Sequence, residues 1–152
     1  MTITALCIGP QGTTDTLELP DGYPAQRQAL RDLLGGTVDA GVYHRRALVH
    51  VFGEGALAQG RELNVAAWAL ACVWRGMDIG YGLYGTAVVT GPGRDDGGSE
   101  ALADDLAEQV RAVCAAVHEV LVVWRAQPPA GEAAARAEVL AAARHHLGAT
   151  AA

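Results

Sequence analysis

The chain has 152 residues, of which 51% are hydrophobic, and it carries a formal net charge of -6. This length suits one compact domain, which buries about 70% of the surface of its extended chain. No apolar run approaches the roughly 20 residues that span a bilayer, and residues 1–4 lack the features of a signal peptide. We therefore expect a cytoplasmic protein with no membrane contact, and the negative charge disfavours direct binding to nucleic acid.

The cysteines and histidines lack the local spacings that are typical of metal sites. Cys7, Cys72 and Cys114 lie far apart within apolar segments, which predicts buried free thiols in a reducing compartment. His145 and His146 are adjacent on an expected helix, where neighbouring side chains point about 100° apart. We therefore expect no metal and no other cofactor.

Turn-forming residues divide the first half of the chain into short segments. Two hairpins are predicted, one from residues 3–8 and 13–19 and one from residues 37–43 and 47–52, the second with a solvated turn at His44-Arg45-Arg46. Residues 25–34 carry apolar side chains at helical spacing, and Gly35-Gly36 suits a left-handed cap at the end of this helix.

A second short helix is predicted after Asn64 and runs to about Trp74. The Asn64 side chain is expected to cap this helix by accepting a hydrogen bond from a free amide of its first turn. A β-branched run at residues 83–91, bounded by glycines, predicts the last strand of the sheet. The glycines and the proline of residues 91–98 then predict a linker.

The remainder of the chain is predicted to be helical. From Ser99, an expected N-cap, apolar residues recur every three or four positions up to Trp124 and indicate a long amphipathic helix that Pro128-Pro129 ends. Residues 132–147 are rich in alanine and predict a last helix with few large anchors, Val139, Leu140 and Leu147.

The predicted fold is α+β, with a small, mostly antiparallel sheet and two short helices, followed by a long C-terminal amphipathic helix and a short alanine-rich helix. Three parts are expected along the chain. Residues 1–93 form the α+β domain, residues 94–127 supply a linker and the long helix, and residues 128–152 form the alanine-rich tail. The long helix is expected to pack on the domain or on a second copy, which would make a homodimer.

Acidic residues gather around the expected start of the long helix, and they form the first candidate site. They are Asp95, Asp96, Glu100, Asp104, Asp105 and Glu108. With seven acids and three arginines, residues 94–125 carry most of the net charge of the molecule. Such a face can imitate DNA phosphates or dock a basic partner protein, although acids are also favoured at a helix start by its dipole.

Aromatic residues near the glycine-rich segment 80–85 form the second candidate site. Asn64, Trp68, Tyr81 and Tyr84 would contact a small molecule or a nucleotide there. The competing interpretation is that tryptophans on alanine-rich helices fill the core. An enzyme ranks third, because no acid–base pair is recognisable and the lone serine, Ser99, is expected to cap a helix. Cysteine catalysis by Cys72 or Cys114 with a distant histidine remains an alternative.

Residues 3–91 contain four short motifs that follow one another in a characteristic order. They are Leu19-Pro20-Asp21-Gly22, Leu34-Gly35-Gly36, Asn64 before Ala66-Ala67, and a closing Gly85-Thr86-Ala87-Val88-Val89-Thr90-Gly91. In their order and spacing they resemble an uncharacterised family of small domains found in actinobacterial genomes, plasmids and phages. Residues 68–74 and the helical tail depart from the family pattern, and the resemblance implies no catalytic residue.

The sequence therefore predicts a non-enzymatic accessory protein of a phage or plasmid that binds a host or defence protein, with the acidic residues as the contact face. The setting in mobile elements comes from the family resemblance alone. The alternative is a small-molecule or nucleotide-binding domain that uses Asn64 and the segment 80–85.

Overall fold

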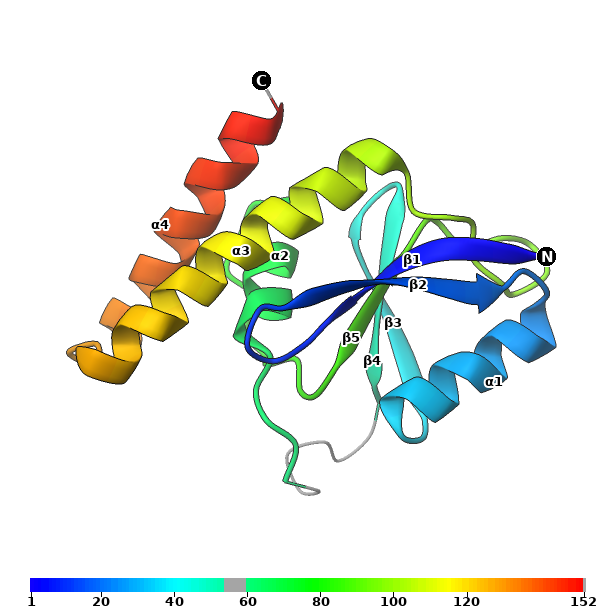
Figure 1. Ribbon diagram of the computed structural model, residues 1–152, viewed down its shortest axis with the longest axis horizontal. Helices are drawn as coiled ribbons and strands as arrows, with labels where there is room; N and C mark the ends of the chain where they lie inside the picture. The colour runs from blue at the N-terminus through cyan, green and yellow to red at the C-terminus, as the bar shows by residue number, and fades with distance from the viewer. Residues whose placement is uncertain (54–59, 152) are drawn as a thin grey trace.

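The computed structural model describes residues 1–53 and 60–151, with side chains up to Leu147. The elements are β1 (Thr2–Ile8), β2 (Thr14–Pro20), α1 (Tyr23–Leu34), β3 (Val38–His44), β4 (Ala47–Phe52), α2 (Val65–Arg75), β5 (Ala87–Thr90), α3 (Asp104–Ala126) and α4 (Glu132–Ala151). They build a five-stranded antiparallel sheet with helices on both faces (Figure 1). The predicted α+β class, both hairpins and all four predicted helices are confirmed.

The strands lie in the order β2-β1-β5-β4-β3. The run predicted as the last strand is last in the sequence but lies at the centre of the sheet, where all four residues of β5 are buried. The strand is also shorter than residues 83–91. Gly85 turns the chain at a φ of +74°, and the N–H of Gly91 leaves the ladder and donates to the carbonyl of Glu100.

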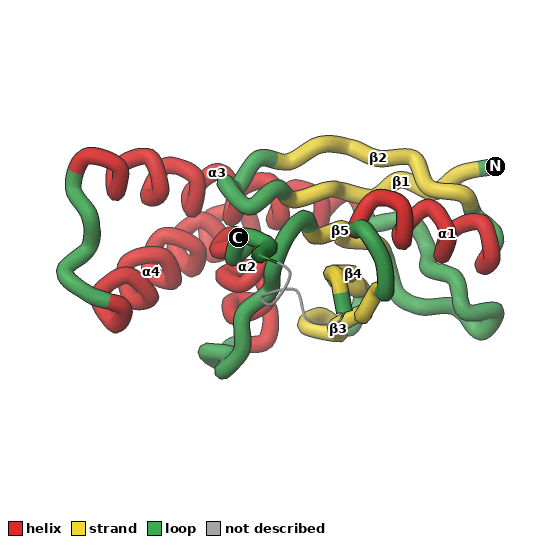
Figure 2. The backbone as a smooth tube through the Cα atoms, turned by 90° about the horizontal axis from the view of Figure 1, so that it is seen from below, coloured by secondary structure: helices red, strands yellow, loops and turns green. Residues whose placement is uncertain are grey.

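The two faces of the sheet bury separate sets of apolar side chains because successive residues of a strand point to opposite sides. On one face, Ile3, Ala5, Leu19 and Val88 pack against Leu30 and Leu34 of α1. On the other face, Leu6, Ile8, Val49 and Val89 belong to a larger core with α2, α3 and α4. Figures 1 and 2 show this division, with α1 on one side of the twisted sheet and α2 and α3 on the other.

Helix α2 lies between the sheet and the two last helices. Residues 66–73 of α2 are all buried, as expected for a helix that contacts protein on every side. Val139 and Leu140 of α4 are 1% and 2% exposed, so they are the anchors that the sequence predicted. Because α2 and α4 cover most of the apolar stripe of α3, Val122 and Val123 are the large apolar side chains that this helix leaves exposed.

The long helix begins at Asp104 and not directly after Ser99, so the predicted N-cap is wrong. Ser99 is buried, and its N–H donates to Oε1 of Gln26 on α1 over 2.8 Å. Leu102 donates its N–H to the carbonyl of Thr4 in β1 over 2.9 Å. Residues 99–102 therefore run beside β1, where β5 has already ended, and a helix cannot start until this contact is complete.

The glycine-rich segment 91–98, predicted as a linker, connects β5 with the helical part of the chain and folds into a closed loop. The N–H of Arg94 donates to the carbonyl of Gly98, and Gly93 forms a bridge with Ser99. The Arg94 guanidinium also forms ion pairs with Asp21, which follows β2, and with Asp96. The loop is thereby tied to the start of α1.

In the described part of the chain, no helix combines the length and the apolar character needed to cross a membrane.

A buried histidine, His50, lies on the face of the sheet that α1 covers. It is 6% exposed, and a ring nitrogen and the hydroxyl of Thr90 are 2.9 Å apart. Burial lowers the pKa of His50 to about 4, because the charged imidazolium is poorly solvated there. The folded state therefore holds the neutral form.

We predict that His50 makes the fold less stable in acid. The unfolded chain binds a proton at His50 near the ordinary pKa of 6.5, and the folded chain only near 4. Above pH 6.5 the histidine is neutral in both states, so the free energy of unfolding has its full value. As the pH falls from 6.5 to 4, only the unfolded chain gains the proton, and the free energy of unfolding decreases. The loss at pH 4.5 is roughly 2–3 kcal/mol. Urea denaturation of wild type and His50→Gln across this range measures it. Identical pH dependence in the two proteins would contradict the assignment.

Candidate binding sites

Asn64 caps α2, as predicted, but its amide also joins two other segments. Its Oδ1 accepts from the N–H of Ala67 over 3.0 Å. Its Nδ2 donates to the carbonyls of Ile8 and Gly85 over 3.0 and 2.8 Å. The side chain is fully buried and lines none of the hollows described below. In this structure Asn64 positions other segments instead of facing a ligand.

Residues 77–84, which we name the strap, run from the end of α2 back towards β5. The carbonyl of Ile79 accepts from the indole N–H of Trp68, and the N–H of Ile79 points to the sulfur of Cys72. Further along, the hydroxyls of Tyr81 and Tyr43 are 2.8 Å apart, which connects the strap to β3. The strap thus has side-chain contacts on both sides and separates two hollows.

The first hollow, which we name the aromatic pocket, lies between α2, the strap, and the adjoining ends of α3 and α4. Its volume is about 620 Å³. Trp68, Tyr81, Tyr84 and Trp124 line it. The structure therefore brings together three of the four residues that the sequence predicted for a ligand site. Trp124 lies 40 residues or more from the others in the chain, so only the fold places it in the same pocket.

The polar atoms around the aromatic pocket are largely bonded within the protein. The indole N–H of Trp124 donates to Glu138 on α4 over 3.2 Å, and that of Trp68 is bonded to the strap. At the rim, Arg136 forms an ion pair with Glu132 over 2.8 Å. The pocket therefore offers ring faces and hydrocarbon surface, and its two charged lining residues neutralise each other.

The acids predicted as a partner face fall into two groups. Asp95, Asp96 and Glu100 lie before α3, whereas Asp104, Asp105 and Glu108 lie in its first turns. Arg94 donates a hydrogen bond to Asp96, and Arg46 donates one to Asp105. These bonds stabilise the charged carboxylates, so both carboxyls have a pKa below the ordinary value. The turn predicted to be merely solvated thus supplies one of these arginines, Arg46.

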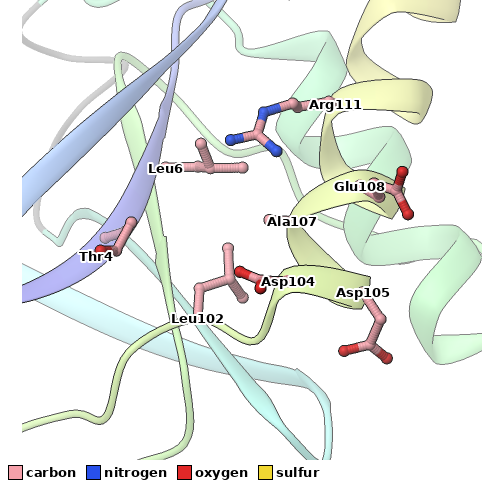
Figure 3. A pocket seen from close by; sticks show the side chains of 9 residues that line it. Thr4, Leu6, Leu102, Asp104, Asp105, Ala107, Glu108 and Arg111 are labelled. Atoms are coloured by element: carbon pink, nitrogen blue, oxygen red, sulfur yellow. The ribbon is translucent and has the colours of Figure 1, made fainter.

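A groove of about 430 Å³ lies beside the start of α3. Leu6 of β1 and Leu102 contribute apolar side chains to it (Figure 3). In Figure 3 the guanidinium of Arg111 extends towards β1, while Asp105 and Glu108 lie along the outer flank of the helix. The groove therefore has buried apolar side chains beneath it and side chains of both charges around it.

The buried thiols do not favour nucleophilic chemistry. Burial raises the pKa of Cys114 to about 12 and also raises the pKa of Cys72, which keeps both thiols protonated at neutral pH. Within residues 1–53 and 60–151, no group of three His, Cys, Asp or Glu side chains converges as metal ligands would.

No family model, curated protein or solved structure matches the chain. The resemblance to the actinobacterial family consequently stays a prediction from sequence motifs.

Proposed function

We propose that this protein binds a small, neutral, largely apolar molecule in the aromatic pocket. The observation that carries the proposal is the pocket itself, about 620 Å³ in volume and lined by the rings of Trp68, Tyr81, Tyr84 and Trp124. Ligand sites in proteins typically measure roughly 300–1,000 Å³ and are lined mainly by apolar and aromatic side chains. Aromatic rings also favour offset or edge-to-face packing with a flat ligand, worth about 0.5–1.5 kcal/mol per pair.

The charges around the pocket favour a neutral ligand over a nucleotide. A phosphate group is usually held by free backbone N–H groups or by unpaired basic side chains. Arg136 is the basic residue among those that line the pocket, and it is already paired with Glu132. The sequence predicted, as its alternative function, a domain that binds a small molecule or a nucleotide. The pairing of Arg136 favours the small molecule over the nucleotide.

We predict that the neutral dye N-phenyl-1-naphthylamine binds in the aromatic pocket with a saturable rise in fluorescence. Ala135 lines the pocket from α4, so Ala135→Trp fills part of the space and should weaken dye binding at least about tenfold. Ala134→Trp is the matched control, because Ala134 is exposed on the same turn and does not line the pocket. Equal dye affinity in both variants, or no saturable binding to the wild type, would contradict the proposal.

A second candidate function is protein–protein binding at the groove beside α3. Leu6 and Leu102 line the groove from the core and are 1% and 6% exposed, and Asp104, one of the acids in the first turns of α3, lines it as well. The exposed acids at this groove suit a partner segment with basic side chains. Asp105 already forms an ion pair with Arg46 of the same chain, which shows that an arginine side chain can bind at the start of α3. An accessory role in a mobile element, which the family resemblance implies, belongs to this candidate.

We predict that reversing the charges of Asp104, Asp105 and Glu108 to lysine releases a partner that the wild type captures. The control reverses three exposed acids elsewhere, Asp15, Asp32 and Glu119, and so changes the net charge equally. Quantitative affinity capture from the native host compares the three proteins. If the groove is the contact, one or more partners remain with the control and disappear with the first variant. The same set of partners in all three would exclude this candidate.

A further inference from the structure

A second hollow, which we name the cage, lies on the other side of the strap. Its volume is about 570 Å³. The side chains that matter for its chemistry are Asp39 and Tyr43 of β3, Phe52 of β4, and Tyr81 and Tyr84 at the end of the strap. Four aromatic rings and one carboxylate therefore line one hollow, and they come from two segments, 39–52 and 81–84, that are 29 or more residues apart in the chain.

We propose that the cage binds a methylated ammonium group, either on a small molecule or on a modified side chain of another protein. A cation that carries methyl groups cannot be strongly hydrated, and the electron-rich faces of aromatic rings attract it. Sites of this kind are built from several aromatic rings, commonly with an acid nearby. The cage supplies both elements, and it is separate from the aromatic pocket of the proposed function.

The charges at the cage fit a cation. Asp39 is the charged residue among those that line it. Within the described residues, the Asp39 carboxylate has neither a hydrogen bond nor an ion pair, so its oxygens are free to contact a bound cation. The net charge of -6 also attracts cations to the molecule as a whole.

Two of the cage rings already bind a cation from this chain. The guanidinium carbon of Arg61 lies 4.0 Å from the centre of the Phe52 ring, and that of Arg75 lies 4.6 Å from the centre of the Tyr43 ring. Neither arginine lines the cage. Tyr43 and Phe52 are 7% and 8% exposed, so the ring most accessible to a ligand is that of Tyr81, which is 51% exposed and has no cation–π partner among the described residues.

Local sequence features place the cage side chains. The Tyr43 ring lies directly over Gly41, where a Cβ atom would come within 2.5 Å of it. The Asp39 carboxylate lies against Gly53, where a Cβ atom would come within 2.9 Å. The hydroxyl contact between Tyr43 and Tyr81 then holds the strap ring next to the β3 ring. The arrangement is thus fixed by two glycines and one hydrogen bond.

We predict that choline binds at the cage and that its neutral isostere, 3,3-dimethylbutan-1-ol, binds at least about tenfold more weakly. NMR titration of the full chain measures both affinities. Asp39→Asn should weaken choline about tenfold while leaving the isostere unchanged. Asp32→Asn is the matched control, because Asp32 is an exposed acid that does not line the cage. Asp39 is itself exposed, so both variants should fold.

Two further arms complete the test. Tyr81→Phe keeps the ring but loses the hydroxyl contact with Tyr43, so it should weaken choline binding less than Tyr81→Leu, which removes the ring. A peptide with trimethyllysine that binds more tightly than choline would indicate a protein source of the cation, and equal or weaker binding would indicate a small molecule. Equal affinity for choline and its isostere, no shift of cage resonances, or equal effects of Asp39→Asn and Asp32→Asn would each overturn the proposal. Dye binding in the aromatic pocket should be unchanged in Asp39→Asn, so the two proposals fail separately.

Discussion

The buried amide of Asn64 joins three segments that are far apart in the sequence. It is fully buried, caps α2 by accepting from the N–H of Ala67, and donates to the end of β1 at Ile8 and to the turn before β5 at Gly85. A buried carbonyl that loses its donor costs about 1–3 kcal/mol. The amide therefore fixes where α2 starts, and it places the central strand of the sheet relative to the helix that covers it.

Both hollows depend on this arrangement because the strap connects the two elements that Asn64 positions. The backbone N–H of Asn64 donates to Leu83, and the N–H of Gly85 donates to Glu62, so the end of the strap is held beside the start of α2. Just before these anchors in the chain, Tyr81 contacts β3 on one side and lines the aromatic pocket on the other. The hydrogen bonds around Asn64 thus hold the strap, which lines both the aromatic pocket and the cage.

The sequence predicts the elements of this fold well because turn residues and apolar spacing are local signals. Asn64 shows what such signals miss, since its cap bond was predictable but its two long-range bonds were not. The central position of β5 was equally hidden, because strand order depends on pairing between distant segments. The predicted N-cap at Ser99 was wrong for the same reason, because the N–H of Ser99 donates to Gln26 on the distant helix α1. Three of the four predicted ligand residues, Trp68, Tyr81 and Tyr84, line one pocket and Asn64 does not, whereas Trp124 joins them through the packing of α3.

Native-state hydrogen exchange in Asn64→Ala tests most directly whether this amide holds the strap. The account predicts that the amides of Ile79 and Gly85 lose far more protection than those of β3 and β4, and that dye binding in the aromatic pocket weakens with them. A uniform loss of protection across all elements would show only a lower global stability. That result, or unchanged exchange at the strap, would contradict the central role of Asn64.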